Sequence, residues 1–313
     1  MKKRVLFLDE VHHSLEDALT EHGFFCEKDY NSVYREILEK IDQYFGLVIR
    51  SRIPIDKELL EKAKNLRFVA RSGSGLENID LKTAEDRGIK VFSSPEGNKD
   101  AVGEHAVGML LMLFNKLNTA DAEVRKGVWL REENRGLELG ARTVGIIGFG
   151  NTGSAFAEKL SGFGCTILAY DKYKENYAPD YVTETSLDEL KKKADVLSIH
   201  LPLSEETNYY IDRDFIESVD SPFYLVNTAR GKQVNTEHLV EGIESGKVLG
   251  ACLDVLEYEK QSLQGLENDL LPDAYSRLLQ FPNVVLTPHV AGWTVESYKK
   301  LSSVLAEKIL QDQ

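Results

Sequence analysis

Cysteine is scarce in this chain of 313 residues, which contains only Cys26, Cys165 and Cys252. The three lie far apart and form no CxxC pair, so neither a disulfide framework nor a cysteine metal site is expected. We interpret them as buried thiols in a reducing cytoplasm. Outside the site discussed below, the histidines show no ligand spacing either, and we expect no metal. These histidines are His12, His13, His22, His105, His200 and His238.

Long hydrophobic runs and net positive charge are also lacking. The longest mostly apolar stretch, residues 106–114, falls well short of the roughly 20 residues that cross a bilayer. The opening MKKRVLFLDE is apolar over only four residues, which argues against a secretory signal. Lys and Arg total 38 against 51 Asp and Glu, a net charge of −13. We therefore expect no nucleic-acid or membrane partner, although a small anionic metabolite can still bind in a pocket.

Short apolar runs alternate with amphipathic segments along the whole chain, which is typical of parallel strands covered by helices. Candidate helix starts are capping boxes at Ser14/Asp17 and Ser186/Glu189 and N-caps at Asp56 and Thr294. Gly23 is a candidate helix end. In a first series, the predicted strands are 4–8, 47–50, 67–71 and 90–93. In a second series, they are 143–147, 166–170, 196–200, 223–227, 248–254 and 284–287.

The length of the chain and the two strand series predict two domains. A long helical pattern from Ala101 to about Lys126 separates the series, and we place a boundary just before it. After His289 the pattern is helical to the end, and this tail could return to cover the first domain. We predict an α/β protein with two doubly wound parallel sheets, residues 98–289 forming one domain and 1–97 with 290–313 the other.

A glycine-rich sequence stands directly after the predicted strand 143–147. It reads GFGNTG and matches GxGxxG, followed by a helical stretch, 154–160. Its residues are Gly148, Phe149, Gly150, Asn151, Thr152 and Gly153. About 20 residues further on, strand 166–170 ends in Asp171, where a carboxylate would bind the ribose hydroxyls of NAD and repel the 2′-phosphate of NADP. The sequence predicts NAD, with Lys172 leaving NADP open.

Polar side chains follow three consecutive strands of the second series, at the edge where reactive groups gather in such sheets. They are Arg230, then Glu257 and Glu259, then His289. Reducing a 2-oxo acid needs a cation for the carboxylate and an acid for the oxygen, roles that Arg230 and His289 suit. A carboxylate beside the histidine would stabilise its protonated form and fix its tautomer, and we choose Glu259 for that position.

The sequence resembles the D-2-hydroxyacid dehydrogenase family over essentially its whole length. The matching segments, in the order of the family, are RSGSGLENID (71–80), residues 98–111 with VGEHAVGMLL, VGIIGFGNTGS, HLPLSEETNYYI, NTARG, LDVLEYE and TPHVAG. The resemblance implies a Rossmann cofactor domain inserted into a flavodoxin-like substrate domain, with substrate held between them. It also implies an NAD-dependent oxidoreductase acting on the CH-OH group of a 2-hydroxy acid, and a homodimer formed through the helix that begins near Ala101.

The same resemblance implies roles for individual residues. Arg230, Glu259 and His289 match the catalytic Arg, Glu and His of the family, and Asp254 would contact the nicotinamide carboxamide. A glycine loop would hold the substrate carboxylate; it comprises Ser72, Gly73, Ser74 and Gly75. To the cofactor site we further assign His200, Pro202, Thr207, Thr228, Ala229 and Gly292. Lys260, Ala291 and Trp293 depart from the common pattern and alter the expected mouth of the pocket.

Among the branches of the family, the resemblance is to D-3-phosphoglycerate dehydrogenases, chiefly through Arg50 and Arg71, two cations that could hold a phosphate. This implies oxidation of D-3-phosphoglycerate to 3-phosphohydroxypyruvate, a step of serine biosynthesis. The chain shows no C-terminal regulatory domain, so feedback by serine through such a domain is not expected.

Four alternatives stay open. They are a glyoxylate or hydroxypyruvate reductase, another D-2-hydroxyacid dehydrogenase such as one for D-lactate, a non-catalytic NAD-sensing protein, and an NAD-dependent formate dehydrogenase. The intact Arg230, Glu259 and His289 argue against a sensor. A formate dehydrogenase would carry a Gln beside its catalytic His, and Glu259 better fits a hydroxyacid enzyme.

Overall fold

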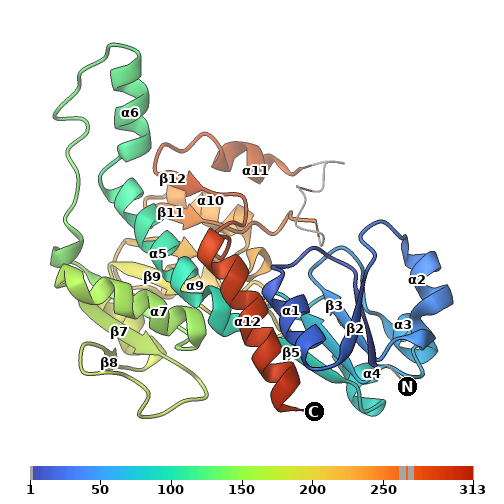
Figure 1. Ribbon diagram of the computed structural model, residues 1–313. Helices are drawn as coiled ribbons and strands as arrows, with labels where there is room; N and C mark the ends of the chain where they lie inside the picture. Colours follow the sequence, from blue (N-terminus) through green and yellow to red (C-terminus); the bar gives the residue numbers. More distant parts are fainter. Residues whose placement is uncertain (1–2, 261–265, 267–270, 313) are drawn as a thin grey trace. The chain divides into compact units, whose positions relative to one another are not determined.

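The computed structural model describes residues 3–260, 266 and 271–312, and these form two compact units (Figure 1). Of the described residues, those up to Lys99 and from Trp293 onward belong to unit 1, and the others to unit 2. The sequence places the divisions after residues 97 and 289, and its ranges include residues 1–2, 261–265, 267–270 and 313, which lie outside the described part. The assignment of substrate and cofactor binding to the two units stays a prediction.

Unit 1 contains a five-stranded parallel sheet with the order β2-β1-β3-β4-β5, which is the flavodoxin-like order. Its strands are β1 (Lys3–Phe7), β2 (Phe24–Lys28), β3 (Gly46–Ile49), β4 (Phe68–Arg71) and β5 (Lys90–Ser93). Its helices are α1 (Ser14–Glu21), α2 (Tyr34–Lys40), η1 (Ile41–Gln43), α3 (Lys57–Lys62), α4 (Leu81–Asp86) and α12 (Val295–Gln311). The order reverses between β1 and β3, so the residues after these strands lie at the switch point of the sheet.

Helices cover both faces of the sheet in unit 1, because successive residues of its strands are buried on opposite sides. Leu6 and Leu47 pack with α2, α3 and α4 in one cluster of buried residues. Phe7 and Val48 pack in a second cluster with α1 and α12. Figure 1 shows α12 running alongside α1. The predicted return of the C-terminal tail to the first domain is therefore confirmed.

Unit 2 contains a seven-stranded parallel sheet with the order β12-β11-β10-β9-β6-β7-β8. Its strands are β6 (Thr143–Ile147), β7 (Thr166–Tyr170), β8 (Thr183–Glu184), β9 (Val196–Ile199), β10 (Phe223–Asn227), β11 (Val248–Leu253) and β12 (Val284–Leu286). The order reverses between β6 and β9. The glycine-rich sequence follows β6 and therefore lies at the switch point, where ligands of such sheets bind.

Helices cover both faces of this sheet as well, which confirms the predicted fold class. One cluster of buried residues joins the sheet to α8, α9 and α10, and another joins it to α5 and α7. The helices are α5 (Pro95–Phe114), which begins in unit 1, α6 (Leu117–Arg125), η2 (Leu139–Ala141), α7 (Asn151–Leu160), η3 (Ser161–Phe163), α8 (Leu187–Lys193), α9 (Arg213–Ser218), η4 (Gly231–Gln233), α10 (Thr236–Glu244) and α11 (Asp273–Leu278). Among the described residues, none of these helices has the length and apolarity to cross a bilayer.

Two sequence predictions of local structure are wrong, and two strands were missed. Ser14 does not form a capping box with Asp17, because the helix is already under way at Ser14, while Asp17 contacts His13 Nδ1 at 2.7 Å. The long helix starts at Pro95 rather than Ala101 and breaks at Lys116, whose φ of 49° ends α5 and precedes α6. Strands β2 and β8 lie at sheet edges and were not predicted. The predicted caps Asp56, Ser186 and Thr294 each accept a backbone hydrogen bond at their helix.

Candidate active site

The turn between β6 and α7 has the geometry of a phosphate-binding loop. Gly148 has φ of +91°, and a Cβ there would lie 2.6 Å from the His200 carbonyl oxygen. A Cβ on Gly153 would lie 2.1 Å from the Gly148 carbonyl oxygen. Gly150, the residue before α7, faces open space, since nothing lies within 4 Å of an added Cβ. Two glycines are thus required by the fold, and the third leaves the helix N-terminus open to an anion.

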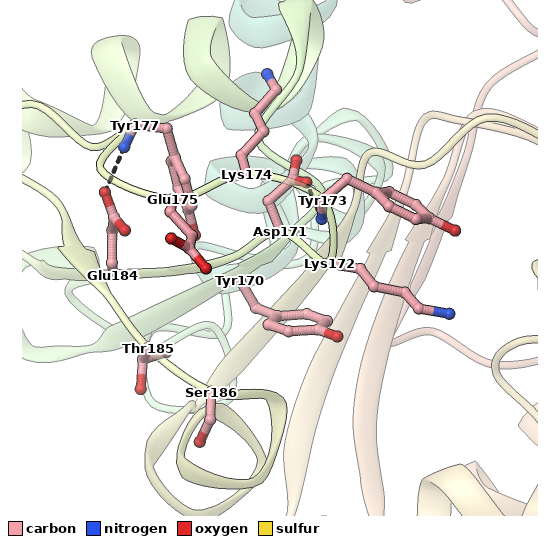
Figure 2. Close-up of a pocket in the computed structure, with 10 residues that line it drawn as sticks. All are labelled: Tyr170, Asp171, Lys172, Tyr173, Lys174, Glu175, Tyr177, Glu184, Thr185 and Ser186. Carbon is pink, nitrogen blue, oxygen red and sulfur yellow. Dashed lines mark hydrogen bonds between the residues drawn. The ribbon is translucent and has the colours of Figure 1, made fainter.

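Asp171 follows β7 and lies beside the glycine-rich turn. Its Oδ2 accepts the Phe149 backbone N–H at 2.8 Å, and its Oδ1 accepts the Tyr173 backbone N–H at 3.0 Å. The carboxylate is therefore fixed against the turn and still has lone pairs for ribose hydroxyls. Asp171 lines a hollow of about 720 Å³. Figure 2 shows the side chains around this hollow. Its lining residues are Tyr170, Asp171, Lys172, Tyr173, Lys174, Glu175, Tyr177, Glu184, Thr185 and Ser186.

His200 follows β9 on the other side of the switch point and is buried. Its Nδ1 lies 3.2 Å from Thr152 Oγ1 and its Nε2 2.8 Å from Ser198 Oγ. Burial lowers the pKa of His200 to about 3. A neutral imidazole bonded to two hydroxyls cannot serve as an acid near pH 7, so His200 shapes the turn.

His289 and Glu259, which the sequence placed together, are in contact. His289 Nδ1 lies 2.6 Å from Glu259 Oε2, and both side chains are largely but not completely buried. The other oxygen of Glu259 accepts the Leu256 backbone N–H at 2.5 Å. The choice of Glu259 over Glu257 agrees with this geometry, because Glu257 instead accepts the Thr236 backbone N–H at 2.8 Å.

His289 has a positive φ of 55°, which is uncommon for a residue with a side chain and typical of functional turns. Asp254, at the end of β11, holds this turn. Its Oδ1 accepts the Thr287 hydroxyl at 2.6 Å and the Val290 N–H at 2.9 Å, and its Oδ2 accepts the Ala291 N–H at 2.9 Å. In addition, His289 N–H donates to the Asp254 carbonyl at 2.7 Å. The buried carboxylate thus fixes the backbone that aims His289.

Arg230 follows β10, in a loop that packs against the loop carrying Glu259. A Cβ on Gly231 would lie 2.0 Å from the Leu256 carbonyl carbon, so the two loops approach as closely as only glycine allows. The side-chain amide of Asn227 donates to the Arg230 carbonyl at 3.0 Å, and the Arg230 guanidinium donates to the Ala229 carbonyl at 2.7 Å. The three strand-end loops of unit 2 therefore form one connected edge.

The remaining cofactor candidates lie along the same edge. Thr207 donates from its hydroxyl to the Pro202 carbonyl at 2.7 Å, which fixes the loop after β9. Ala229 donates its backbone N–H to Asn227 Oδ1 at 3.0 Å. The Thr228 hydroxyl is buried without a hydrogen-bond partner among the described residues. Gly292 is the last residue of unit 2.

The substrate candidates belong to unit 1 and cluster at the carboxyl ends of β3 and β4. Arg50 donates its backbone N–H to Asp9 Oδ2 at 2.5 Å, and its guanidinium lies 4.0 Å from the centre of the Trp293 ring. Burial lowers the pKa of Arg50. Arg71 Nε donates to the Arg50 carbonyl at 3.2 Å. The two arginines are therefore neighbours, and Trp293, noted as a departure, packs on one of them.

The loop after β4 continues this cluster. Ser72 N–H donates to the Ile49 carbonyl at 2.9 Å, and Ser74 Oγ donates to Asn98 Oδ1 at 2.8 Å. A Cβ on Gly73 would lie 2.6 Å from the Arg71 guanidinium, so that guanidinium lies over the loop. Gly75 completes the predicted segment.

Three contributors escaped prediction. Thr287 and His105 join the Asp254 network, with His105 Nε2 3.0 Å from Thr287 Oγ1. Thr287 stands two residues before His289, a position that could have drawn attention. Lys174 lines the hollow and donates to the Phe149 carbonyl at 2.7 Å, and no sequence signal marks it. The described residues hold no group of three or more His, Cys, Asp or Glu side chains arranged for a metal.

Comparison with known proteins agrees with this architecture. The family model described as D-isomer specific 2-hydroxyacid dehydrogenase, NAD binding domain, matches residues 107–291. A hydroxypyruvate reductase of Thermotoga maritima is 36% identical over 297 residues, covering 95% of this chain and 90% of that protein. A D-3-phosphoglycerate dehydrogenase of Archaeoglobus fulgidus is 33% identical, covering 98% of this chain and 56% of that protein. The chain thus spans about half the length of the phosphoglycerate dehydrogenases that it matches.

Solved structures give the same result. A crystal structure of D-lactate dehydrogenase from Aquifex aeolicus, complexed with NAD and lactic acid, has a TM-score of 0.85 and 28% identity, covering 99% of this chain and 95% of that one. The sequence-based predictions of the family, of an oxidoreductase and of NAD as cofactor are confirmed. The chain belongs to the D-isomer specific 2-hydroxyacid dehydrogenase family.

Proposed function

We propose that His289 is the acid and base of this dehydrogenase, that Glu259 orients it, and that Arg230 binds the substrate carboxylate. The observation that carries the proposal is the contact of 2.6 Å between His289 Nδ1 and Glu259 Oε2 at the edge that also bears the glycine-rich turn. An ionised carboxylate only accepts hydrogen bonds, so Nδ1 carries the proton. The other nitrogen, Nε2, is left to exchange a proton with the substrate oxygen.

The glycine-rich turn and Asp171 fit a dinucleotide. The open approach at Gly150 suits a pyrophosphate, and the fixed Asp171 carboxylate suits ribose hydroxyls. When bound, NAD supplies the acceptor or donor of the hydride. During oxidation His289 takes the hydroxyl proton while the hydride leaves C2, and during reduction His289 returns a proton to the oxygen of the 2-oxo acid. The positive charge of Arg230 would hold the carboxylate and polarise the neighbouring carbonyl.

For the substrate we propose D-3-phosphoglycerate, oxidised to 3-phosphohydroxypyruvate, the step of serine biosynthesis implied by the resemblance. The support is the cluster of Arg50 and Arg71 at the carboxyl ends of β3 and β4, with the Arg71 guanidinium over the loop after β4. Two arginines at one sheet edge are suited to a phosphate, because each guanidinium presents a planar fork of donors. The relatives named as D-3-phosphoglycerate dehydrogenases add support.

A second candidate is reduction of hydroxypyruvate or glyoxylate. It is favoured by the Thermotoga maritima hydroxypyruvate reductase and by a glyoxylate reductase of Thermofilum pendens, 35% identical, because this chain covers 90% and 82% of them.

The deciding experiment measures NADH oxidation at neutral pH with 3-phosphohydroxypyruvate, hydroxypyruvate, glyoxylate and pyruvate, for the wild type and His289→Ala. We expect the highest kcat/KM for the phosphorylated substrate and its loss in the variant. A higher kcat/KM for hydroxypyruvate or glyoxylate would replace the first candidate by the second. Binding of NADH without turnover of any 2-oxo acid would contradict both.

We also propose a homodimer formed through the region of α5 and α6. In Figure 1, α6 and the segment after it extend away from the sheet of their own unit. Large apolar side chains are exposed there, and Trp129 is exposed over 76% of its surface. The others are Leu117, Val124, Val128 and Leu130. Exposed apolar groups gathered on one segment are typical of an interface, so light scattering should give twice the mass of the chain.

The cytoplasm is our proposed location. The described structure contains Cys26, Cys165 and Cys252 as free thiols. Burial raises the pKa of each of these thiols, which suits cysteines that are inert in a reducing compartment. Fractionation of cells that express the full chain checks this.

A further inference from the structure

Lys172 directly follows the carboxylate that selects the cofactor, and its ammonium group is bound by an acid from another strand end. Glu206, in the loop after β9, accepts Lys172 Nζ on Oε1 and the Tyr173 hydroxyl on Oε2, the latter at 2.7 Å. Figure 2 shows Lys172 and Tyr173 extending from the chain toward the same side. The Glu206 carboxylate thus accepts hydrogen bonds from both residues that follow Asp171, Lys172 and Tyr173.

The hollow around Asp171 would otherwise suit a phosphate. Among its lining residues, the two cations are Lys172 and Lys174. Lys174 donates to the Phe149 carbonyl at 2.7 Å and so lies against the glycine-rich turn. The other acid that is fixed here, Glu184, is engaged by the backbone N–H groups of residues 176–178. Lys172 is therefore the lysine whose side chain is held by an acid rather than by the turn itself.

Both members of the pair are charged at neutral pH. The hydrogen bond from Lys172, followed by that from Tyr173, lowers the pKa of Glu206. The hydrogen bond to Glu206 raises the pKa of Lys172. A negative charge accordingly accompanies the lysine, and a 2′-phosphate approaching Lys172 would meet two carboxylates, Asp171 and Glu206, instead of one.

We infer that Glu206 is a specificity-determining residue that directs cofactor choice to NAD by holding Lys172 away from the 2′-phosphate of NADP. Asp171 repels that phosphate directly, while Glu206 removes the cation that would otherwise compensate. An exposed ion pair contributes little to folding stability, so the effect appears in nucleotide selectivity rather than in stability. The inference rests on the cofactor assignment and is independent of the substrate proposed above.

The test measures nucleotide binding without substrate, by calorimetric titration of the full chain with NADH, NADPH, 5′-AMP and adenosine 2′,5′-bisphosphate. In Glu206→Gln we expect NADPH and the bisphosphate to bind about tenfold more tightly, because the lysine released from Glu206 can then pair with the phosphate dianion. NADH and 5′-AMP should change by less than about twofold, since neither carries the phosphate. Low salt should enlarge the difference.

Two controls assign the effect. Glu205→Gln removes the same charge one residue away, and the described structure gives Glu206 and not Glu205 as the partner of Lys172. Lys172→Met added to Glu206→Gln should abolish the gain if the freed lysine causes it. Equal gains in the Glu205 and Glu206 variants, or a gain that survives Lys172→Met, would overturn the inference. Failure of the wild type to bind NADH would instead contradict the cofactor assignment, and this inference with it.

Discussion

The carboxyl ends of the two sheets hold their polar residues in different ways. In unit 2, side chains bind one another: His289 contacts Glu259, and Asp254 accepts the Thr287 hydroxyl and two backbone N–H groups. In unit 1, the guanidinium of Arg50 lies on the Trp293 ring, while Arg71 donates to a backbone carbonyl. The catalytic candidates of unit 2 are thus held by carboxylates, whereas the printed contacts of the Arg50 and Arg71 guanidinium groups in unit 1 are with a ring and a backbone carbonyl.

This difference separates two tasks. A proton-transferring group must be oriented before the substrate arrives, and a carboxylate partner does this at all times. Groups that recognise an anion need positive charge in a fixed position, and contacts with a carbonyl or a ring help to position a guanidinium. We therefore expect the chemistry to depend on unit 2 and the recognition on unit 1, and single substitutions in each unit test this.

The largest expected effect follows from Glu259→Gln. The amide keeps the shape of the side chain but stabilises the histidinium poorly and can donate to Nδ1, which favours the wrong tautomer. We expect kcat to fall about 10²- to 10³-fold with a much smaller change in KM. Steady-state kinetics of this variant and the wild type check this.

Glu257→Gln is the matched control, because Glu257 accepts the Thr236 N–H and has no contact with His289 in the described structure. An equal loss of kcat in both variants would show that Glu259 acts through folding rather than through His289.

The glycine-rich turn offers a second test, of unit 2 alone. A methyl group at Gly153 meets backbone 2.1 Å away, whereas one at Gly150 meets nothing within 4 Å. Gly153→Ala should lower the free energy of unfolding by about 2 to 4 kcal/mol, since the clash is with backbone. Gly150→Ala should fold normally and bind NADH about tenfold more weakly, because the methyl group occupies the approach to the helix N-terminus.

Urea denaturation and NADH titration of both variants distinguish the two roles. Comparable stability of the two proteins would remove the argument that the fold itself requires Gly153.

In unit 1, Arg71→Ala should raise KM for a phosphorylated substrate at least tenfold, the loss expected for one charge-assisted hydrogen bond. KM for hydroxypyruvate should change little, and kcat should be preserved for both. Arg71→Lys keeps the charge without the planar fork, so its KM for the phosphorylated substrate should lie between those of the wild type and Arg71→Ala. Equal losses with both substrates would contradict a phosphate role.

The smallest expected effect concerns the ion pair between Arg4 of β1 and Glu27 of β2 and its dependence on pH. Arg4 contacts both oxygens of Glu27, at 2.6 and 2.9 Å, and this hydrogen bonding lowers the pKa of Glu27 in the folded protein. A lowered folded pKa contributes stability above the unfolded value of about 4.3, and this is lost as pH falls through the folded value.

Glu27→Gln should therefore destabilise the protein at pH 7 by about 1 kcal/mol or less, because the pair is partly exposed, with the difference shrinking below about pH 4. Hydrogen exchange of the amides of β1 and β2 measures it. A difference that stays constant with pH would exclude the ion pair as its cause.

Strands that the sequence predicted to the residue, such as β6, β7 and β10, are buried apolar runs, whose composition alone reveals them. Strand β2 escaped because FFCEK lies at an edge and mixes exposed and buried positions, and β8 because it has two residues, both exposed. The helix break at Lys116 was not predicted, because a lysine adopts the left-handed conformation there and no glycine or proline marks the position.

The candidate site divides similarly. His289 and Glu259 could be paired from sequence because parallel strand ends share one edge, a rule of topology. The hydrogen bonds that Asp254 accepts from Thr287, Val290 and Ala291 could not be predicted, because they depend on the geometry between segments more than 30 residues apart. The same holds for Glu206, whose sequence neighbourhood gives no sign that it reaches Lys172.

The placement of α12 in unit 1 sets an order of assembly. Its Leu305 and Ile309 complete the cluster that contains Val5, Phe7 and Leu15, so the core of unit 1 cannot close until α12 has been synthesised. All strands of unit 2 leave the ribosome earlier. Protein domains commonly fold from the N-terminus onward during synthesis. Here the unit whose synthesis begins first completes its core last, because the core around β1 to β5 includes α12.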